Sequence, residues 1–456
     1  MKRKTIILIL GLAIILISGF IITSRAIYNS RFKSNYNAPV DRKEAWLQDL
    51  THFQKNYYKV CKSFPVDSIY KSNKIIDSIK ETIDSFSDNK IKLLLSHCVS
   101  MADDAHTTVY FRNFRRIPLR LYLFDDGLYV IKAKKGFEQF LGKKVVTICD
   151  KSIDELIEIL DYYKSGNKSW IENESSYFLA SPDFFEAANL SPTSDSIKYE
   201  FTDKNDSFSS YLYPIENIDK SDEYSAWRDL SPISNIKTDT MNWEHVLNDT
   251  LLPLYLSYPN NDYHVDYLGT LHAMYIQINT SNNSEGFNRA IKNCLDSNNV
   301  QHLIIDFRFN GGGDYTKLAA FSKTIHQKVK GKIFIITGKA TFSAGICIAA
   351  RLKYFSKGRA VIIGQNSGDS LQFWAEGRQF SLPNSKIVAR AVYGYHDWEN
   401  DNFELFKTHW INLFFGVAAK DLTPDAPVKF LFKDYYKGID KTIIEITTLH
   451  NTQYSQ

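Results

Sequence analysis

Two short stretches of the chain combine residue types that can carry out nucleophilic chemistry. The first is Thr341-Phe-Ser-Ala-Gly345, which places a serine among small residues directly before an apolar helical pattern. A turn of this kind at a helix N-terminus can expose the Ser343 hydroxyl and bring backbone N–H groups beside it. Taken alone, the stretch is better explained by an ordinary helix cap on Ser343 or Thr341.

The second stretch is rich in glycine and runs Asp306-Phe-Arg-Phe-Asn-Gly-Gly-Gly-Asp314 after an apolar strand pattern. Consecutive glycines let backbone N–H groups approach an anion closely, although a glycine triplet also suits a flexible turn. Together the two stretches predict a nucleophile, Ser343. They also predict an oxyanion hole formed by N–H groups of Gly311 or Gly312 and of Ala344.

The elements that must position these residues alternate between strand and helix. Apolar runs predict strands over 275–279, 303–306, 333–337 and 361–363, with helices over 286–295, 318–329 and 344–355. Such alternation predicts a mainly parallel α/β sheet with ligands at the carboxyl ends of its strands. Both stretches follow strand ends, so we expect them to lie close together.

The earlier part of the chain has a different character. Apolar residues at helical spacing predict a helical domain before residue 115, and alternating patterns with an Asp125-Asp-Gly127 turn predict a β-rich domain after it. The predicted divisions are a cytoplasmic tail over 1–4, a membrane segment over 5–23, a tether over 24–42, a helical domain over 43–115, a β-rich domain over 116–225, a connecting segment over 226–264 and an α/β core over 265–456.

The N-terminus predicts a membrane segment. Lys2, Arg3 and Lys4 precede an uncharged, Ile- and Leu-rich run over 5–23, which is about long enough to span a bilayer as a helix. The basic start favours an inside N-terminus, so we expect a single-pass cell-membrane protein with most of the chain extracytoplasmic. The alternative is a signal peptide cleaved after Ala26, which would give a secreted protein.

Composition excludes several other classes. The formal charge of +4 over 456 residues, without a dense Lys/Arg cluster, predicts no nucleic-acid partner. The five cysteines are far apart, and neither they nor the histidines fall in a metal-ligand spacing. The sequence therefore predicts no metal site, no zinc peptidase and no cofactor.

Three segments of the α/β part resemble one known family. Leu303 to Gly313, Thr341 to Gly345 and Val361 to Gly364 resemble the tail-specific protease and tricorn-core family of serine peptidases. The resemblance implies a crotonase-like (ClpP/crotonase-type) spiral of ββα units and a peptide or protein substrate. Residues 141–156 are similar to the PDZ-like element of such proteins, so 116–225 is expected to be PDZ-like.

The resemblance also directs the choice of the general base. Tail-specific members use a lysine after a motif that Gly364-Gln-Asn-Ser-Gly-Asp-Ser370 replaces here, and this stretch contains no lysine. Asp103-Asp-Ala-His106-Thr107 resembles the segment that carries the histidine of the tricorn-like branch. We therefore predict His106 as the base, because a neutral imidazole near pH 7 can take the serine proton.

The residue that orients His106 is harder to assign from sequence. Glu376, in Trp374-Ala-Glu-Gly377, ranks first. The other carboxylates that we consider are Asp103, Asp104, Glu399 and Asp421.

The predicted function is a membrane-anchored extracytoplasmic serine endopeptidase that forms an acyl-enzyme on Ser343. The alternative is a non-catalytic binding protein on the same scaffold that carries hydrophobic ligands or peptides.

Overall fold

The N-terminal part of the protein is a small helical layer. The computed structural model describes residues 23–111, 113–203, 206–215, 226–233, 243–247 and 252–454. The layer contains α2 (Arg42–Val60), α3 (Val66–Glu81) and α4 (Asp88–Ser100). Caps start two of these helices: the side chain of Asp41 accepts the Glu44 N–H, and that of Ser87 accepts the Lys90 N–H.

A seven-stranded antiparallel sheet follows the helical layer. Its strands are β1 (Leu119–Phe124), β2 (Gly127–Lys134), β3 (Lys144–Ile148), β4 (Lys151–Ser152), β5 (Ile197–Asp203), β6 (Asp206–Leu212) and β7 (Trp243–His245). Helices α5 (Ile153–Tyr163), α6 (Lys168–Phe178) and α7 (Pro182–Ala187) accompany the sheet. A capping box between Ser152 and Glu155 starts α5 directly after the β3–β4 turn.

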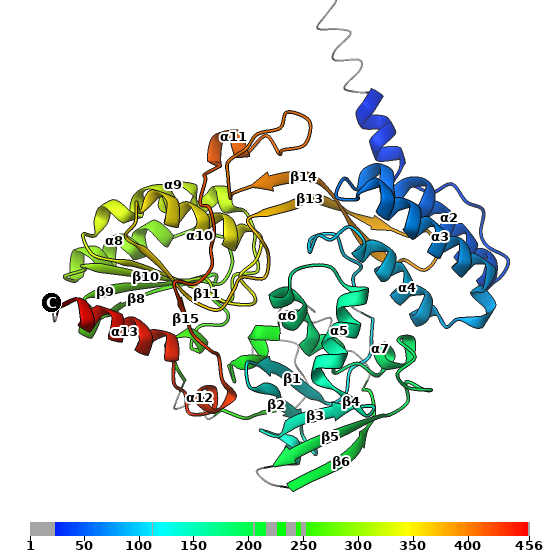
Figure 1. Cartoon of the computed structure of the whole chain (residues 1–456), viewed down its shortest axis with the longest axis horizontal. Coiled ribbons are helices and arrows are strands. Elements are labelled where there is room, and N and C mark those ends of the chain that lie inside the picture. Colours follow the sequence, from blue (N-terminus) through cyan, green and yellow to red (C-terminus); the bar gives the residue numbers. More distant parts are fainter. Residues whose placement is uncertain are drawn as a thin grey trace, which may run out of the picture.

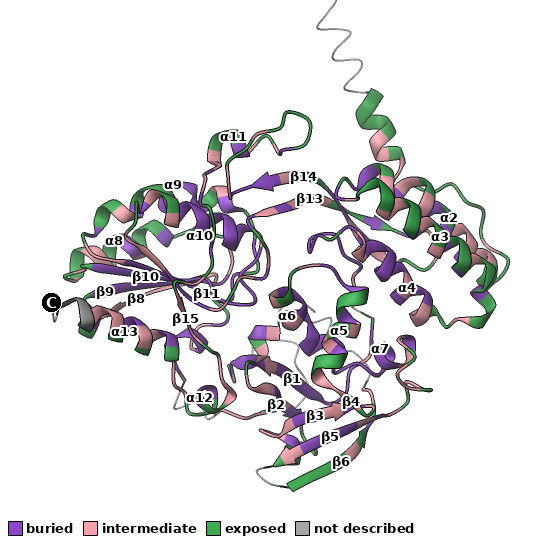
Figure 2. Ribbon diagram, in the orientation of Figure 1, coloured by how far each residue is buried: buried purple, intermediate pink, exposed green. Residues whose placement is uncertain are grey.

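The α/β part is built on a six-stranded sheet in the order β15-β12-β11-β10-β9-β8. The strands are β8 (Tyr263–Leu268), β9 (Ala273–Ile278), β10 (His302–Asp306), β11 (Ile333–Thr337), β12 (Ala360–Gly364) and β15 (Ala426–Pro427). All neighbours pair in parallel except β8 with β9. The central strands are buried along their whole length (Figure 2), as expected for a sheet covered on both faces.

Helices α8 (Phe287–Ser297), α9 (Ala319–Thr324) and α10 (Ala344–Phe355) connect these strands. The strands and helices predicted between residues 275 and 363 are present, with one difference. The single helix expected over 318–329 is a short α9 flanked by 3₁₀ turns at Tyr315–Leu318 and Ile325–Lys328.

A long hairpin joins the α/β part to the helical layer (Figure 1). It consists of β13 (Gln372–Ser381) and β14 (Val388–Asp397). The Tyr57 hydroxyl donates to the Arg390 carbonyl at 2.7 Å, and the Lys62 N–H donates to the Val392 carbonyl at 2.7 Å. Phe380, near the tip, belongs to the same hydrophobic core as α2. A segment that follows the α/β sheet in sequence thus completes the core of the N-terminal helices.

The C-terminal segments are α11 (Asn412–Phe415), α12 (Phe432–Tyr436) and α13 (Lys441–Tyr454). Phe430, Phe432 and Tyr435 pack against Phe124 of β1. This aromatic contact ties the antiparallel sheet to the end of the chain. The mixed α/β class predicted from the sequence is confirmed.

The predicted location in a membrane requires correction. No helix among the described residues is long and apolar enough to cross a bilayer, so a single-pass membrane protein with a membrane partner at 5–23 is not supported. Residues 5–22 of that segment lie outside the described residues, and the part that is described continues as a mostly exposed, polar helix over 23–30. Cleavage after Ala26 stays a prediction.

Candidate active site

Ser343 occupies a strained position between β11 and α10. Its φ of 53° and ψ of −119° lie outside the regions that non-glycine residues ordinarily adopt. Its side chain forms no cap hydrogen bond to α10, so the simple capping explanation does not describe this serine. The neighbouring Thr341 hydroxyl donates to the Phe307 carbonyl at 2.8 Å and accepts the Gly338 N–H at 2.9 Å. These buried bonds anchor the serine turn to the strand ends.

The glycine loop packs directly against Ser343. A Cβ atom at Gly312 would lie 2.9 Å from the Ser343 Cβ and 3.3 Å from its Oγ, and the φ of Gly312 is 122°. Glycine is therefore required there for both space and conformation. The Phe342 N–H donates to the Asn310 carbonyl at 2.9 Å, which holds the loop and the serine turn together.

The predicted oxyanion donors differ in availability. The Gly312 N–H donates to the Asn310 Oδ1 at 3.0 Å, so it is already committed to the loop. Within the described part of the chain, the N–H groups of Gly311 and Ala344 have no hydrogen-bond acceptor. Of the predicted set, these two remain able to bind an oxyanion.

Buried ion pairs brace the base of the glycine loop. Arg308 contacts Asp306 at 2.9 Å and Asp440 at 3.0 Å. The Tyr275 hydroxyl donates to the Asp306 Oδ2 at 2.8 Å. Arg308 is thus held away from any substrate and connects the loop to the start of α13.

His106 lies buried beside the serine turn, with 3% of its surface exposed. Its imidazole is stacked between two rings: Phe342 at 4.3 Å between centroids and Phe373 at 5.1 Å. Neither ring nitrogen has a hydrogen-bond partner among the described residues, so His106 is not hydrogen-bonded to Ser343 in this structure. Burial lowers the pKa of His106 to about 3, which keeps the imidazole neutral.

Asp369 is the carboxylate that lies against His106. Its Oδ2 is 3.3 Å from the His106 Nδ1, and its side chain is only 9% exposed. Burial raises the pKa of Asp369 to about 8, so the neutral form of both groups is favoured near pH 7. Sequence reasoning missed Asp369, although it stands in the Gly364–Ser370 stretch that replaces the family's lysine motif.

Asp104 shapes the turn that carries His106. Its Oδ1 accepts the Trp374 N–H at 2.9 Å and its Oδ2 accepts the Thr107 hydroxyl at 2.6 Å. Burial raises the pKa of Asp104 to about 6. This carboxylate therefore ties the His106 turn to β13, while the neighbouring Asp103 is exposed.

Glu376 lies on β13 and faces a different histidine. Its Oε1 is 3.4 Å from the His396 Nε2, and this close contact with His396 lowers the pKa of Glu376. Phe373 stacks on both imidazoles, at 5.1 Å from His106 and 5.2 Å from His396, and so separates the two histidines. The structure places Gly312 against Ser343, and it stacks Phe342, the residue before Ser343, on His106. Glu376 pairs with His396 instead.

One family model matches part of this site. It is the model of peptidase family S41, and it matches residues 272–328, from β9 through the glycine loop to the end of the α9 region. Over these residues the chain matches the serine peptidases of family S41. The family resemblance seen in the sequence is thereby confirmed.

Solved structures share the fold of this chain. Mature CPAF complexed with lactacystin matches with a TM-score of 0.57 and 12% identity, over 89% of this chain and 98% of that one. The CPAF S499A mutant matches with the same TM-score and identity, over 90% and 97%. No curated protein is similar enough in sequence to match the chain.

A large cleft opens beside α6. It has a volume of about 1150 Å³ and lies between the β1–β2 turn, β3, α5 and α6, with Lys339 at its inner end. Lys339 contacts Glu172 at 2.7 Å and Asp125 at 3.1 Å. Trp170 of α6 stacks on Phe342 at 4.1 Å, so the wall of the cleft continues into the residue before Ser343.

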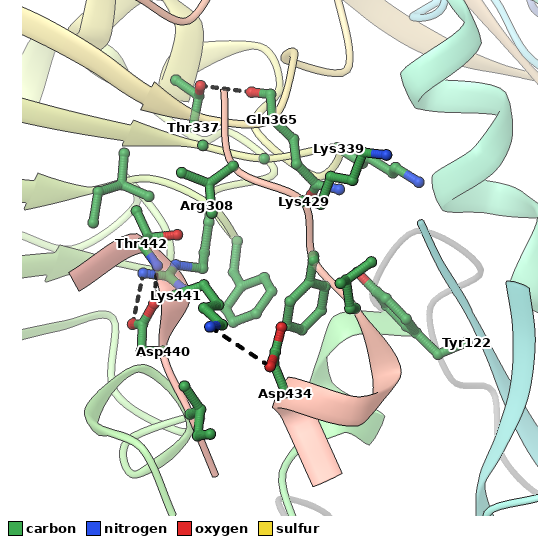
Figure 3. Close-up of a pocket in the computed structure, with 18 residues that line it drawn as sticks. Tyr122, Arg308, Thr337, Lys339, Gln365, Lys429, Asp434, Asp440, Lys441 and Thr442 are labelled. Atoms are coloured by element: carbon green, nitrogen blue, oxygen red, sulfur yellow. Dashed lines mark hydrogen bonds and ion pairs between the residues drawn. The ribbon is translucent and has the colours of Figure 1, made fainter. Parts of the chain in front are cut away.

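A second, much smaller cavity lies at the carboxyl edge of the sheet (Figure 3). Its volume is about 30 Å³. Among the residues that line it, Arg308 contacts Asp440 and Lys441 contacts Asp434 (Figure 3). Neither Ser343 nor His106 lines this cavity, so it is separate from the predicted catalytic residues.

Proposed function

We propose that this S41-type serine peptidase is an endopeptidase that cleaves peptide bonds through an acyl-enzyme on Ser343. The observation that carries the proposal is the geometry of the serine turn. Ser343 is held at a φ of 53° at the start of α10, directly against Gly312. Strain of this kind at a helix start is stored where a side chain must be presented to a ligand.

The proposed steps use groups that surround this turn. The Ser343 Oγ attacks the substrate carbonyl carbon as His106 takes the hydroxyl proton. The N–H groups of Gly311 and Ala344 stabilise the negative charge on the carbonyl oxygen. His106 then returns the proton to the leaving amine, and water cleaves the acyl-enzyme by the same route to release the second product and restore Ser343.

We propose Asp369, in place of Glu376, as the residue that orients His106. The contact of 3.3 Å joins the Asp369 Oδ2 to the Nδ1, which leaves the Nε2 to face the serine. Glu376 pairs with His396 instead. A partner at Nδ1 selects the tautomer and the ring plane of a catalytic histidine.

Catalysis also requires a rearrangement of the two rings, Phe342 and Phe373, that stack on His106. His106 lacks a hydrogen bond to Ser343, and the Phe342 ring covers one of its faces. Catalytic hydrogen bonds often form only in the substrate complex. We propose that substrate entering from the α6 side moves Phe342 and brings the imidazole to the serine.

We further propose that the α/β part is a crotonase-like core and that residues 116–225 form a PDZ-like unit. The support is the parallel order of β9, β10, β11 and β12 with intervening helices and the strand-turn-helix of β3, β4 and α5. The cleft of about 1150 Å³ between β3 and α5 is large enough for several residues of an extended peptide.

A fluorophosphonate probe tests the nucleophile directly. Purified protein should be labelled and should hydrolyse casein, and Ser343→Ala should abolish both. Ser356→Ala, at the far end of the same helix, serves as the matched control and should retain both. Labelling that persists in Ser343→Ala would overturn the assignment. Absence of labelling together with tight binding of hydrophobic ligands or peptides would support the non-catalytic alternative.

A further inference from the structure

The structure gathers three side chains with metal-ligand chemistry on the β13–β14 hairpin. Glu376 comes from β13, His396 from β14, and His409 from the turn that follows β14. One ligand atom from each lies within 4.8 Å of the others. The three residues are far apart in sequence, which is why no spacing pattern predicts a metal site.

The distances fit a single ion at the first two residues. The Glu376 Oε1 and the His396 Nε2 are 3.4 Å apart. Two ligand atoms about 2.1 Å from one tetrahedral ion lie about 3.4 Å from each other. Their arrangement therefore already matches two coordination positions. The ligand atom of His409 lies within 4.8 Å of the other two, so it must move closer to take a third position.

His396 is an unusual residue for a core. It is 1% exposed, and neither ring nitrogen has a hydrogen-bond partner within the described ranges. Buried histidine nitrogens are normally satisfied, because an unpaired polar group in the interior costs free energy. Glu376 provides an ion-pair contact at Nε2, and a bound cation would satisfy that nitrogen and the carboxylate together.

The backbone around the cluster favours convergence of the three side chains. Glu376 has a φ of 52° within a strand, which turns its side chain out of the regular alternation. A Cβ atom at Gly394 would lie 3.0 Å from the Glu376 Cγ and 3.1 Å from the His409 Cδ2. The His409 N–H donates to the Tyr395 carbonyl at 2.7 Å, so the third side chain is anchored beside β14.

We propose that Glu376, His396 and His409 bind a zinc ion that fastens the turn after β14 to the hairpin. Two imidazoles and one carboxylate are a donor set that zinc prefers, with water at the fourth position. His409 is only partly buried, which leaves that position open to solvent. Two imidazole donors favour zinc over calcium or magnesium, which take oxygen ligands. Arg390 interacts electrostatically with Glu376, so the ion must compete with a guanidinium.

The test is zinc binding by the metal-free full chain, followed by calorimetry and by the visible absorption of the Co²⁺ derivative. We expect one zinc per chain and a higher melting temperature with zinc. His409→Ala and Glu376→Gln should each weaken binding by about tenfold or more and abolish the thermal shift. His409 is partly exposed, so its variant should fold.

His264→Ala is the matched control, because His264 lies 3.7 Å from Asp266 but belongs to no three-residue cluster among the described residues. This variant should bind zinc like the parent protein. Absence of stoichiometric zinc binding, or equal affinity in His409→Ala and Glu376→Gln, would overturn the proposal. The readouts do not depend on Ser343, so Ser343→Ala should bind zinc normally whether or not the peptidase proposal holds.

Discussion

The serine side and the histidine side of the proposed active site are built in different ways. Ser343 and Gly312 follow β11 and β10, which are neighbouring strands of one parallel sheet. Hydrogen bonds from the Thr341 hydroxyl to the Phe307 carbonyl and from the Phe342 N–H to the Asn310 carbonyl hold them together. His106, by contrast, follows the helical layer, and its contacts Asp369 and Phe373 come from the link into β13.

The difference concerns how each side is stabilised. The serine side is held by backbone geometry and hydrogen bonds. The strained φ of Ser343 persists because the surrounding strand ends fix the turn. The histidine side is held by ring stacking and burial without a hydrogen bond to the imidazole. We infer that the nucleophile is preformed, whereas the base depends on packing between distant segments.

The largest expected effect is on the serine side. Ser343→Ala should lower kcat by about 10⁴-fold or more, because the nucleophile of a serine peptidase acts as a unit with its base. The measurement is the steady-state rate on a quenched fluorescent peptide. The circular dichroism spectrum should stay unchanged. Substantial remaining activity would contradict the assignment of Ser343 as the nucleophile.

On the histidine side, His106→Gln should lower kcat by about 10²–10⁴-fold, the usual contribution of a general base. The same variant should still react slowly with the fluorophosphonate probe, since Ser343 and its N–H donors remain. A rate equal to that of the parent protein would mean that another residue takes the proton.

The glycine loop offers a paired test within one motif. Gly312→Ala should lower kcat by about 10²–10³-fold, because the added Cβ would lie 2.9 Å from the Ser343 Cβ and displace it from the N–H donors. Gly311→Ala is the control, since a Cβ there meets no atom within 4 Å. Equal losses in the two variants would show that loop flexibility, rather than the contact with Ser343, matters.

The smallest expected effect is on stability and concerns Asp369. Burial raises the pKa of Asp369 to about 8, against about 3.9 in an unfolded chain. The folded state keeps a proton that the unfolded state has lost, so this group's contribution to stability falls as pH rises from about 4 to 8. Asparagine does not ionise, so Asp369→Asn should remove this fall in the free energy of unfolding.

Denaturant unfolding at pH 5 and pH 7.5 measures this effect. Relative to the parent protein, Asp369→Asn should gain up to about 1.4 kcal/mol of unfolding free energy per pH unit across that interval. Parallel pH profiles for the two proteins would show that Asp369 ionises in the folded state as it does in the unfolded chain.

The sequence predicted the serine side in detail because local patterns determine it. Apolar runs placed β9, β10, β11 and β12 within a few residues, and the loops at the ends of β10 and β11 led to the prediction of Ser343 as the nucleophile and of Gly312 in the oxyanion hole. Parallel neighbours end at the same edge of a sheet, so order along the chain was enough to bring these loops together.

The histidine side could be predicted only in part. A motif resemblance singled out His106, but the sequence analysis ranked Glu376 first as its partner and did not consider Asp369. A reversed φ at Glu376 and the pairing register of the hairpin direct that side chain to His396. Neither feature has a signal in the residue types around position 376.

The sequence by itself determined the family, the mixed α/β class and the position of the serine turn, because strand periodicity and glycine conformations act over short distances. Only the tertiary structure decided which carboxylate meets His106, which N–H groups remain free, and that Glu376, His396 and His409 converge. These contacts depend on where the β13–β14 hairpin crosses to the helical layer, and such long-range packing is set by the whole core rather than by neighbouring residues.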